Sequence, residues 1–392
     1  MPEVNVPRIG FDPFTYEAIP RHHELMREAL AQAPVCYLEP YGVYVTGRHQ
    51  LAQSMFKEWQ VFTSTVKAWG EREFIRKTLV QEDPPDHAHI RQPMMRLFTP
   101  VALKAYEEYF TIQAESMADA MVEKGVLDGV ADIAAPFVLK VFPDIIGAID
   151  LDRPKLLPWA DLAFNSNVPS NQIYLDCKAR NGDILQWFNA QIRRDNFTAA
   201  GMAGQIYAMA DEGLISPEEA DVMIVIIFSA GFDTTISAIG SGLKLLAEHP
   251  AEWQKLRDNP ALVRTAFEET IRMEPPARSV GRGVKIDNDL WGLPLKAGDK
   301  VASFLAVVGR DAAVWENPDE FHVDRRKVMG HLAFGGGIHA CSGQALARME
   351  FNAIISALVK RVKRIELAGP PKRKINNNAS GFDEVPLRLV AA

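Results

Sequence analysis

Cys341 lies in a stretch of sequence that could hold a reactive sulfur atom. Residues 334–340 are FGGGIHA, and Gly343 follows the cysteine just before a helical pattern begins. Glycines let backbone amides approach closely, and the N-terminus of a helix favours an anion. Both effects lower the pKa of a thiol and supply N–H donors to a thiolate. The segment therefore predicts a metal ligand or a nucleophile, and the alternative is a glycine-rich turn with an incidental cysteine.

The other two cysteines carry no comparable pattern. Cys36 lies among apolar residues of a predicted strand and Cys177 near a predicted helix start, so both are interpreted as inert thiols. No pair has CxxC spacing, which argues against a structural zinc site and a c-type haem attachment. An odd count of three cysteines cannot form a disulfide framework and favours a reducing compartment.

A long apolar helix is predicted in the middle of the chain. Residues 222–246 are almost wholly apolar and long enough to cross a bilayer, but Asp233 lies in their middle. A central aspartate is unfavourable in lipid. The sequence SPEE at 216–219 predicts a capping box with proline at the first helical position, and Pro250 ends the helix. We therefore expect a buried core helix rather than a membrane span.

The remaining pattern predicts a mainly α protein with a minor β part. Strand patterns occur in a hairpin at 35–46, in residues 284–301 and after Lys363, and helical periodicity dominates elsewhere. No repeat or linker divides the chain. We expect a single domain over residues 1–392, β-rich in about residues 1–65 and helical in the remainder.

Composition narrows the possible partners and the compartment. The 392 residues are 47% hydrophobic with a net charge of −7, so disorder is excluded and neither nucleic acid nor a membrane is expected as a partner. The first residues show no basic region followed by an apolar run, so no signal peptide is expected. The predicted location is the cytoplasm.

Four motifs in the right order resemble the cytochrome P450 monooxygenases. The pattern F-x-x-G-x-H-x-C-x-G at 334–343 is similar to the haem-binding motif of that family, and AGFDT at 230–234 to its oxygen-activating motif. ETIR at 269–272 and PDEF at 318–321 resemble its Glu-x-x-Arg motif and the meander that follows. The resemblance covers the whole chain. It implies the cytochrome P450 fold, with a long central helix over haem b and small antiparallel sheets.

The resemblance implies which residues hold the haem. Cys341 would ligate the iron through a thiolate, which pushes electron density onto the metal. Four of the matching positions bind haem propionates in the family, and Phe334 would shield the sulfur and tune the redox potential. The implied haem-binding residues are His87, Arg91, Arg282, Phe334, His339, Cys341 and Gly343.

Asp233 and Thr234 resemble the acid–alcohol pair of the family and are the predicted catalytic residues. A threonine hydroxyl can hold a water or an oxygen species, while the neighbouring carboxylate relays protons. A buried aspartate in an apolar helix is unfavourable without such a role. The alternative is an aspartate at a helix kink, paired with a buried arginine.

Glu269 and Arg272 lie one turn apart in the motif ETIR, and the resemblance pairs them with Arg325. We expect a buried ion pair, in which removal of one partner is strongly destabilising. These three residues are therefore predicted to be structural, holding the loop that presents Cys341.

The expected electron donor is a separate protein. Arg96, Lys104 and Arg348 fall on helices near the cysteine loop in the family arrangement, on a protein that is acidic overall. Such a patch could steer an acidic [2Fe-2S] ferredoxin, which is reduced by an NAD(P)H-dependent reductase. The alternative is a solvated face with scattered charge.

Family positions also indicate a substrate pocket. Its wall would draw on residues 61–76 and 165–172 and on apolar side chains of the central helix, which favours a compact aromatic substrate. The predicted pocket residues are Phe164, Val168, Ile226, Ala230, Ala277, Arg278 and Phe382.

Three short segments, at 141–144, 156–158 and 376–377, are similar to bacterial enzymes that O-demethylate para-substituted benzoates. Those enzymes hold the substrate carboxylate with polar helix residues, where this sequence has Val225 and Ile226. A buried carboxylate without a partner costs several kcal/mol. The expectation is therefore a neutral phenol or aryl ether. An aromatic acid is the alternative, with Lys67, Arg72, Arg76 or Arg278 as its anchor.

The function that follows is a haem-thiolate monooxygenase that hydroxylates or O-demethylates a small aromatic molecule, with dioxygen and electrons from a ferredoxin. One alternative is a peroxygenase driven by hydrogen peroxide, and another is a haem sensor without catalytic activity. The Asp233–Thr234 pair argues against both alternatives, because neither needs protons delivered to dioxygen.

Overall fold

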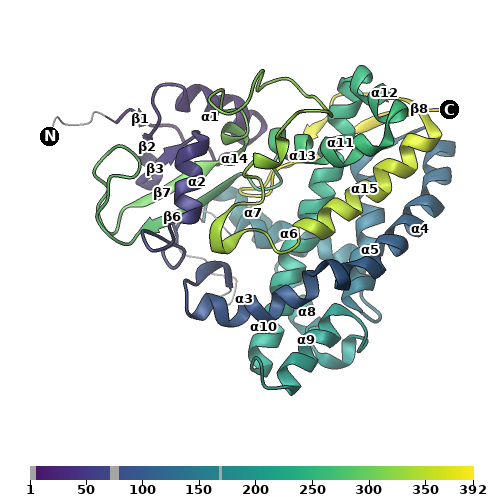
Figure 1. Cartoon of the computed structure of the whole chain (residues 1–392), viewed down its shortest axis with the longest axis horizontal. Helices are drawn as coiled ribbons and strands as arrows, with labels where there is room; N and C mark the ends of the chain where they lie inside the picture. The colour runs from purple at the N-terminus through teal and green to yellow at the C-terminus, as the bar shows by residue number, and fades with distance from the viewer. Residues whose placement is uncertain (1–5, 71–78, 167–169) are drawn as a thin grey trace.

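Helices make up most of the protein, and short strands gather at one side of it (Figure 1). The computed structural model describes residues 6–70, 79–166 and 170–392. The helices are α1 (His22–Leu30), α2 (His49–Lys57), α3 (Asp86–Met95), α4 (Pro100–Lys124), α5 (Ala135–Ile146), α6 (Leu156–Asn165), α7 (Gln172–Arg180), α8 (Ile184–Gln191), α9 (Met202–Asp211), α10 (Pro217–Gly231), α11 (Asp233–Glu248), α12 (Pro250–Asp258), α13 (Val263–Met273), α14 (Leu305–Val308) and α15 (Gln344–Arg361). The mainly α class predicted from the sequence is confirmed.

The strands form three separate sheets. They are β1 (Arg8–Ile9), β2 (Cys36–Leu38), β3 (Val43–Thr46), β4 (Phe62–Thr63), β5 (Val126–Asp128), β6 (Ser279–Val284), β7 (Lys300–Phe304), β8 (Val362–Leu367), β9 (Lys372–Arg373), β10 (Phe382–Glu384) and β11 (Pro386–Ala391). The largest sheet has the order β1-β2-β3-β7-β6-β4, and the others are β5-β11-β8 and β10-β9.

The largest sheet differs from the sequence-based expectation in two ways. Its β1–β2 and β3–β7 pairs are parallel, although the other pairs are antiparallel as expected. It also joins β6 and β7, from the region where the sequence predicts later strands, to the N-terminal hairpin. Val45 of β3 pairs with Ala302 of β7, and this pairing has no local signal in the sequence.

The long apolar helix begins where the sequence predicts. Ser216 accepts a hydrogen bond from the Glu219 backbone, and the Glu219 side chain accepts one from Ser216, completing the capping box. One break interrupts it at Phe232, between α10 and α11. Residues 217–248 are long and apolar enough to cross a membrane, but 61% of their most apolar window is buried inside the fold, as a core helix requires.

A glycine explains the geometry at the helix break. A Cβ atom on Gly231 would lie 2.2 Å from the ring of Phe142, so only glycine lets α5 pack against the end of α10. Asp233 and Thr234 follow at once, on the first turn of α11. The break therefore places both polar side chains where the helical hydrogen-bond ladder is interrupted.

The cysteine loop precedes α15, which packs along α4 (Figure 1). Gly337 has a φ of +62°, and a Cβ atom there would lie 2.1 Å from the carbonyl oxygen of Phe56 in α2. Glycine is therefore required at this position of the predicted motif for two reasons, its backbone conformation and the close approach of α2.

Candidate active site

Cys341 is held at the start of α15 by its own loop. Its backbone N–H donates to the carbonyl of Phe334 at 2.9 Å, which closes the glycine-rich segment. Burial raises the pKa of the Cys341 thiol, and the backbone N–H groups of Gly343 and Gln344 oppose this effect. The sequence-based expectation of a lowered pKa is wrong for the protein chain alone, because the cost of desolvation exceeds the stabilisation by N–H donors.

Two imidazoles and two guanidinium groups converge beside Cys341. The rings of His87 on α3 and His339 lie 4.5 Å apart. Arg91, one turn after His87, donates to the Ser342 hydroxyl at 2.9 Å and also to the carbonyl of Ala340. Burial, followed by the charges of Arg282, His87 and Arg91, lowers the pKa of His339 to about 3. Positive charges gathered around a buried imidazole in this way favour the binding of an anion.

Haem fits this arrangement of donors. His87 Nε2 is buried and has no hydrogen-bond partner among the described residues, a costly state that a propionate carboxylate would relieve. A Cβ atom on Gly343 would meet nothing within 4 Å, which leaves room beside the sulfur. Phe334 lines the same cavity as Cys341, His339 and Arg282. Four predicted haem-binding residues thus line one cavity, while His87 and Arg91 lie next to it through their contacts with His339 and Ser342.

Thr234 lines this cavity from the α11 side, and Ala230 lies beside it. The Thr234 hydroxyl donates to the Ala230 carbonyl at 2.7 Å, across the break in the helix. Asp233 is buried, with Oδ1 accepting a hydrogen bond from Lys374 Nζ at 2.6 Å and Oδ2 without a partner among the described residues. The buried cation at this helix kink is therefore a lysine, where the sequence suggested an arginine.

The predicted pocket residues do not all lie on the described cavity wall. Ala230 and Ala277 line it, together with Val66, Trp69 and Val280. Among the described residues, Phe164, Ile226, Arg278 and Phe382 are not part of that wall. Val168 lies outside the described residues, as do residues 71–76 of the predicted 61–76 segment.

Arg278 and Phe382 have other partners instead. The guanidinium of Arg278 is buried and donates to the carbonyls of Asn376 and Ala379, away from the cavity wall. Burial, with the nearby charge of Arg373, lowers the pKa of Arg278 to about 9. Phe382 packs under the guanidinium of Arg373, whose carbon lies 4.3 Å from its ring centroid. Neither side chain is placed to anchor a substrate carboxylate.

Glu269, Arg272 and Arg325 form one buried ion cluster. Glu269 accepts from Arg272 at 2.7 and 2.8 Å and from Arg325 at 2.8 and 3.0 Å. The two arginines also donate to carbonyls of residues 309 and 316–320, which tie the irregular meander to α13. None of these three side chains lines the cavity, which agrees with a structural role.

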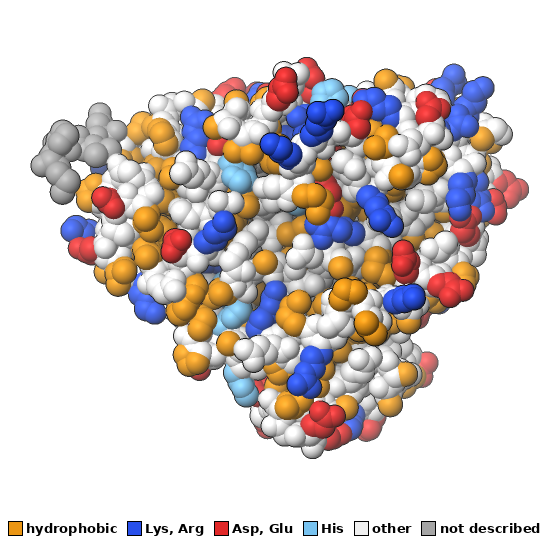
Figure 2. Space-filling view, viewed as in Figure 1, with side chains coloured by type: hydrophobic (Ala, Val, Ile, Leu, Met, Phe, Trp, Pro, Cys, Tyr) orange, Lys and Arg blue, Asp and Glu red, His pale blue; other side chains and the backbone are white. Residues whose placement is uncertain are grey.

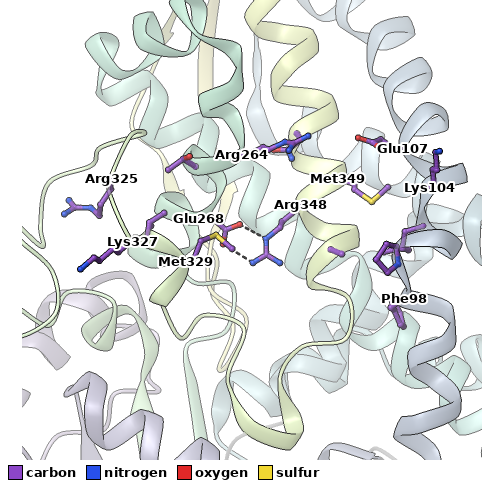
Figure 3. Close-up of a pocket in the computed structure, with 16 residues that line it drawn as sticks. Phe98, Lys104, Glu107, Arg264, Glu268, Arg325, Lys327, Met329, Arg348 and Met349 are labelled. Carbon is purple, nitrogen blue, oxygen red and sulfur yellow. Dashed lines mark hydrogen bonds and ion pairs between the residues drawn. The ribbon is translucent and has the colours of Figure 1, made fainter.

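A surface hollow lies on the other side of the cysteine loop, between α4, α13 and α15 (Figure 3). Lys104, Arg264 and Lys327 are exposed around it, and Met329 is 64% exposed. Figure 2 shows basic and apolar side chains interspersed over this face. Arg96, on the short 3-10 helix Arg96–Phe98, is also exposed.

Arg348 differs from the surface cation expected at its position. It makes two hydrogen bonds with the buried Glu268 (Figure 3), and its guanidinium carbon lies 4.8 Å from the Phe334 ring centroid. Glu268 also pairs with His331 at 2.8 Å. Arg348 therefore links α15 and α13 to the aromatic residue beside Cys341.

Sequence reasoning missed three site residues. Lys374 reaches Asp233 from 141 positions away, and Ser64 bonds His339 Nε2 at 2.9 Å from 275 positions away. Glu268 could have been noticed as a second glutamate next to the ETIR motif. For Lys374 and Ser64 the sequence holds no local signal, because only the tertiary fold brings them near their partners.

Comparison with known proteins agrees with this geometry. The family model described as Cytochrome P450 matches residues 178–383. Cytochrome P450 CYP199A2 of Rhodopseudomonas palustris is 34% identical over 398 residues, covering 99% of this chain and 95% of the relative. The chain is a cytochrome P450. Its cofactor is therefore haem b, and it is a monooxygenase by family.

Two further relatives show the breadth of the cytochrome P450 family. The biotin biosynthesis cytochrome P450 of Bacillus subtilis is 27% identical and covers 85% of this chain and 86% of the relative. The crystal structure of CYP109E1 from Bacillus megaterium in complex with testosterone superimposes with a TM-score of 0.81 at 26% identity. That match covers 96% of this chain and 98% of the other.

Proposed function

We propose that this cytochrome P450 hydroxylates or O-demethylates a small neutral aromatic molecule, using dioxygen and electrons from a [2Fe-2S] ferredoxin. One observation carries the proposal. Cys341 and Thr234 line the same largely apolar cavity, so a cysteine that can ligate iron and a hydroxyl that can handle protons face a common space. We place the enzyme in the cytoplasm, as a single domain.

The residues proposed to bind haem and those proposed to deliver protons lie on two sides of the cavity. Bound haem would supply the oxygen-activating chemistry that the reaction needs. Cys341 would hold the iron as a thiolate, and His87, Arg91, Arg282 and His339 would hold the propionates. On the opposite side, Thr234 positions a proton donor and Asp233 passes protons to it from the protein interior.

The cavity wall favours a substrate without a carboxylate. Near the helix break the wall consists of Ala230, Ala238 and Ala277, with Val280 and Trp69 adding apolar surface. Arg278, one of the anchors expected for an acid, is turned towards backbone carbonyls, whereas Lys67, another of them, lines the cavity. Placing a carboxylate against the apolar part of this wall, away from Lys67, would cost several kcal/mol. A phenol or an aryl ether avoids that cost, and methyl ethers suit the likeness to O-demethylating enzymes.

The hollow beside the cysteine loop suits an acidic redox partner. Its exposed cations Lys104, Arg264 and Lys327 outnumber the exposed Glu107 and would steer a negatively charged ferredoxin, and Met329 offers an apolar contact. Ala345 and Arg348 of α15, the helix that follows Cys341, line the hollow, so electrons would enter near the cysteine ligand. An NAD(P)H-dependent reductase would reduce the ferredoxin.

A spin-state titration of the ferric holoenzyme tests the substrate proposal. A molecule that displaces the iron-bound water shifts the Soret band, so the titration reports binding next to the iron. We expect a strong shift with 4-methoxyphenol and guaiacol and at least about tenfold weaker binding of 4-methoxybenzoate, corresponding to about 1.4 kcal/mol. Tighter binding of the benzoate would reject the proposal that the substrate is neutral.

A single substitution tests whether Cys341 is the ligand of the haem iron. Cys341→His is expected to abolish the thiolate-type absorption spectrum while a haem-binding fold remains, because the sulfur is the predicted metal ligand. Cys36→Ser, which changes a buried cysteine of β2, is the matched control. An unchanged spectrum in Cys341→His would reject the assignment.

A further inference from the structure

An ion pair joins the central helix break to the C-terminal hairpin. Lys374 follows β9, and its Nζ lies 2.6 Å from Asp233 Oδ1. The side chain of Asp233 is 2% exposed and that of Lys374 is 15% exposed. The other carboxylate oxygen of Asp233, Oδ2, is buried and has no partner among the described residues. One oxygen of the predicted proton donor is thus held and the other is left available.

The charges around Lys374 favour its protonated form. Burial lowers the pKa of the Lys374 ammonium, but the charge of Asp233 and its hydrogen bond, together with Asp161 on α6 and Asp383 on β10, raise it overall. Asp383 is exposed, so the group of charges reaches from the helix break to the surface. Lys374 therefore stays a cation next to Asp233 at neutral pH.

The hairpin that carries Lys374 is itself anchored. The neighbouring Arg373 makes two hydrogen bonds to the buried Glu274 at the end of α13. The Lys374 backbone N–H donates to the carbonyl of Gly381 at 3.1 Å, across the hairpin. A Cβ atom on Gly381 would lie 2.9 Å from Ser237 of α11, so the hairpin packs tightly on that helix. The position of Lys374 is thus set by α13 and α11 together.

We propose that Lys374 is a positioning residue for proton delivery, which holds Oδ1 of Asp233 so that Oδ2 stays free to exchange a proton on the side of Thr234. This inference rests on the proton-relay role of Asp233 in the proposed function. Without the lysine, a buried carboxylate loses its compensating charge, so it takes up a proton or turns towards another donor. In either state the Asp233 carboxylate no longer delivers a proton for each electron that the ferredoxin supplies.

The decisive variants are Lys374→Met and Lys374→Arg, with Lys372→Met as control. Lys372 lies on the same hairpin but forms an exposed pair with Glu384 at 2.7 Å. The assay uses 4-methoxyphenol with a reconstituted ferredoxin system and measures product and hydrogen peroxide per NADH consumed. Lys374→Met is expected to lower product per NADH at least fivefold with a matching rise in peroxide. Lys374→Arg is expected to restore at least half the yield, and Lys372→Met to leave it unchanged.

A second reaction separates positioning from a general loss of structure. Oxidation driven by added hydrogen peroxide brings its own protons, so it bypasses Asp233. Lys374→Met should therefore keep its peroxide-driven rate within twofold of wild type. Equal losses in the NADH-driven and peroxide-driven reactions, or an unchanged yield per NADH, would overturn the proposal.

A measurement without turnover tests the pair directly. In urea unfolding of the ferric holoenzyme, Lys374→Met should lower the midpoint in the wild-type background and change it little in the Asp233→Asn background. Equal shifts in both backgrounds would reject the pairing. If wild type neither binds nor oxidises 4-methoxyphenol, the substrate proposal fails, whereas the unfolding cycle and the peroxide released per NADH still decide the role of Lys374.

Discussion

The buried cluster around Glu269 allows a quantitative test of what burial does to an ion pair. Arg272 and Arg364 each contact a glutamate, Glu269 at 2.7 Å and Glu366 at 3.0 Å. The side chains of the first pair are 0% exposed, and those of the second are 61% and 42% exposed. Changing each arginine to methionine removes the same charge and the same number of donors, so the two variants differ mainly in environment.

The expected magnitudes differ severalfold. Arg272 also donates to the carbonyls of residues 309, 318 and 320, so Arg272→Met leaves a buried carboxylate with one cation fewer and three carbonyls without that donor. Breaking a buried pair in this way costs about 3–5 kcal/mol, against a total stability of about 5–15 kcal/mol. An exposed pair contributes about 0–1 kcal/mol, which bounds the effect of Arg364→Met.

Urea unfolding followed by far-ultraviolet circular dichroism measures the difference. With a slope of about 3 kcal/mol per molar urea, Arg272→Met should lower the midpoint by about 1 M or more, and Arg364→Met by less than about 0.3 M. Loss of the meander contacts should also reduce the haem content of the purified Arg272→Met variant. Similar midpoints for the two variants would refute the argument that burial sets the cost.

Three further outcomes follow from the geometry. Thr234→Ala should reduce product per NADH about tenfold or more and raise peroxide release, and unchanged coupling would show that the hydroxyl has no part in proton delivery. Burial, with the charges of Arg278, His23 and Arg373, lowers the pKa of His22 well below 6.5. Below pH 6.5 the His22 imidazole therefore binds a proton only in the unfolded state, so the free energy of unfolding falls. Between pH 7.5 and 5.5, the wild type should lose about 1.4 kcal/mol more unfolding free energy than His22→Phe, as measured by urea unfolding. An identical pH dependence of the two proteins would contradict the assignment of this loss to His22. Gly337→Ala should reduce the ratio of Soret to protein absorbance, because positive φ alone costs about 1–2 kcal/mol and the new Cβ would meet the Phe56 carbonyl. The control Gly182→Ala should leave this ratio unchanged, because the nearest atom to its Cβ would lie 3.6 Å away.

The sequence was most informative where chemistry depends on local spacing. The motif around Cys341, the capping box at Ser216 and the pair Asp233–Thr234 could all be predicted, because each is set by residues within a few positions of one another. The family, the fold class and the haem cofactor followed from these motifs in combination.

The unpredicted features depend on contacts between distant segments. Lys374 meets Asp233 only because the hairpin of β9 and β10 packs on α11, and Arg348 turns inward because α13 presents Glu268 to it. The direction of the Cys341 pKa was wrong for a related reason. The sequence shows the N–H donors of a helix start, but the degree of burial that outweighs them is a property of the folded chain.

The pairing of β3 with β7 has a consequence for how the chain is made. During synthesis the edge of β3 remains open until residues 301–303 have left the ribosome, and the cysteine loop emerges later still. An exposed strand edge is a template for pairing with other chains. Fragments that end before β7 should therefore aggregate, and the nascent protein should depend on chaperones until nearly its whole length is available. Capture of the cofactor would be among the last events of folding, because it needs the cysteine loop as well as the earlier helices.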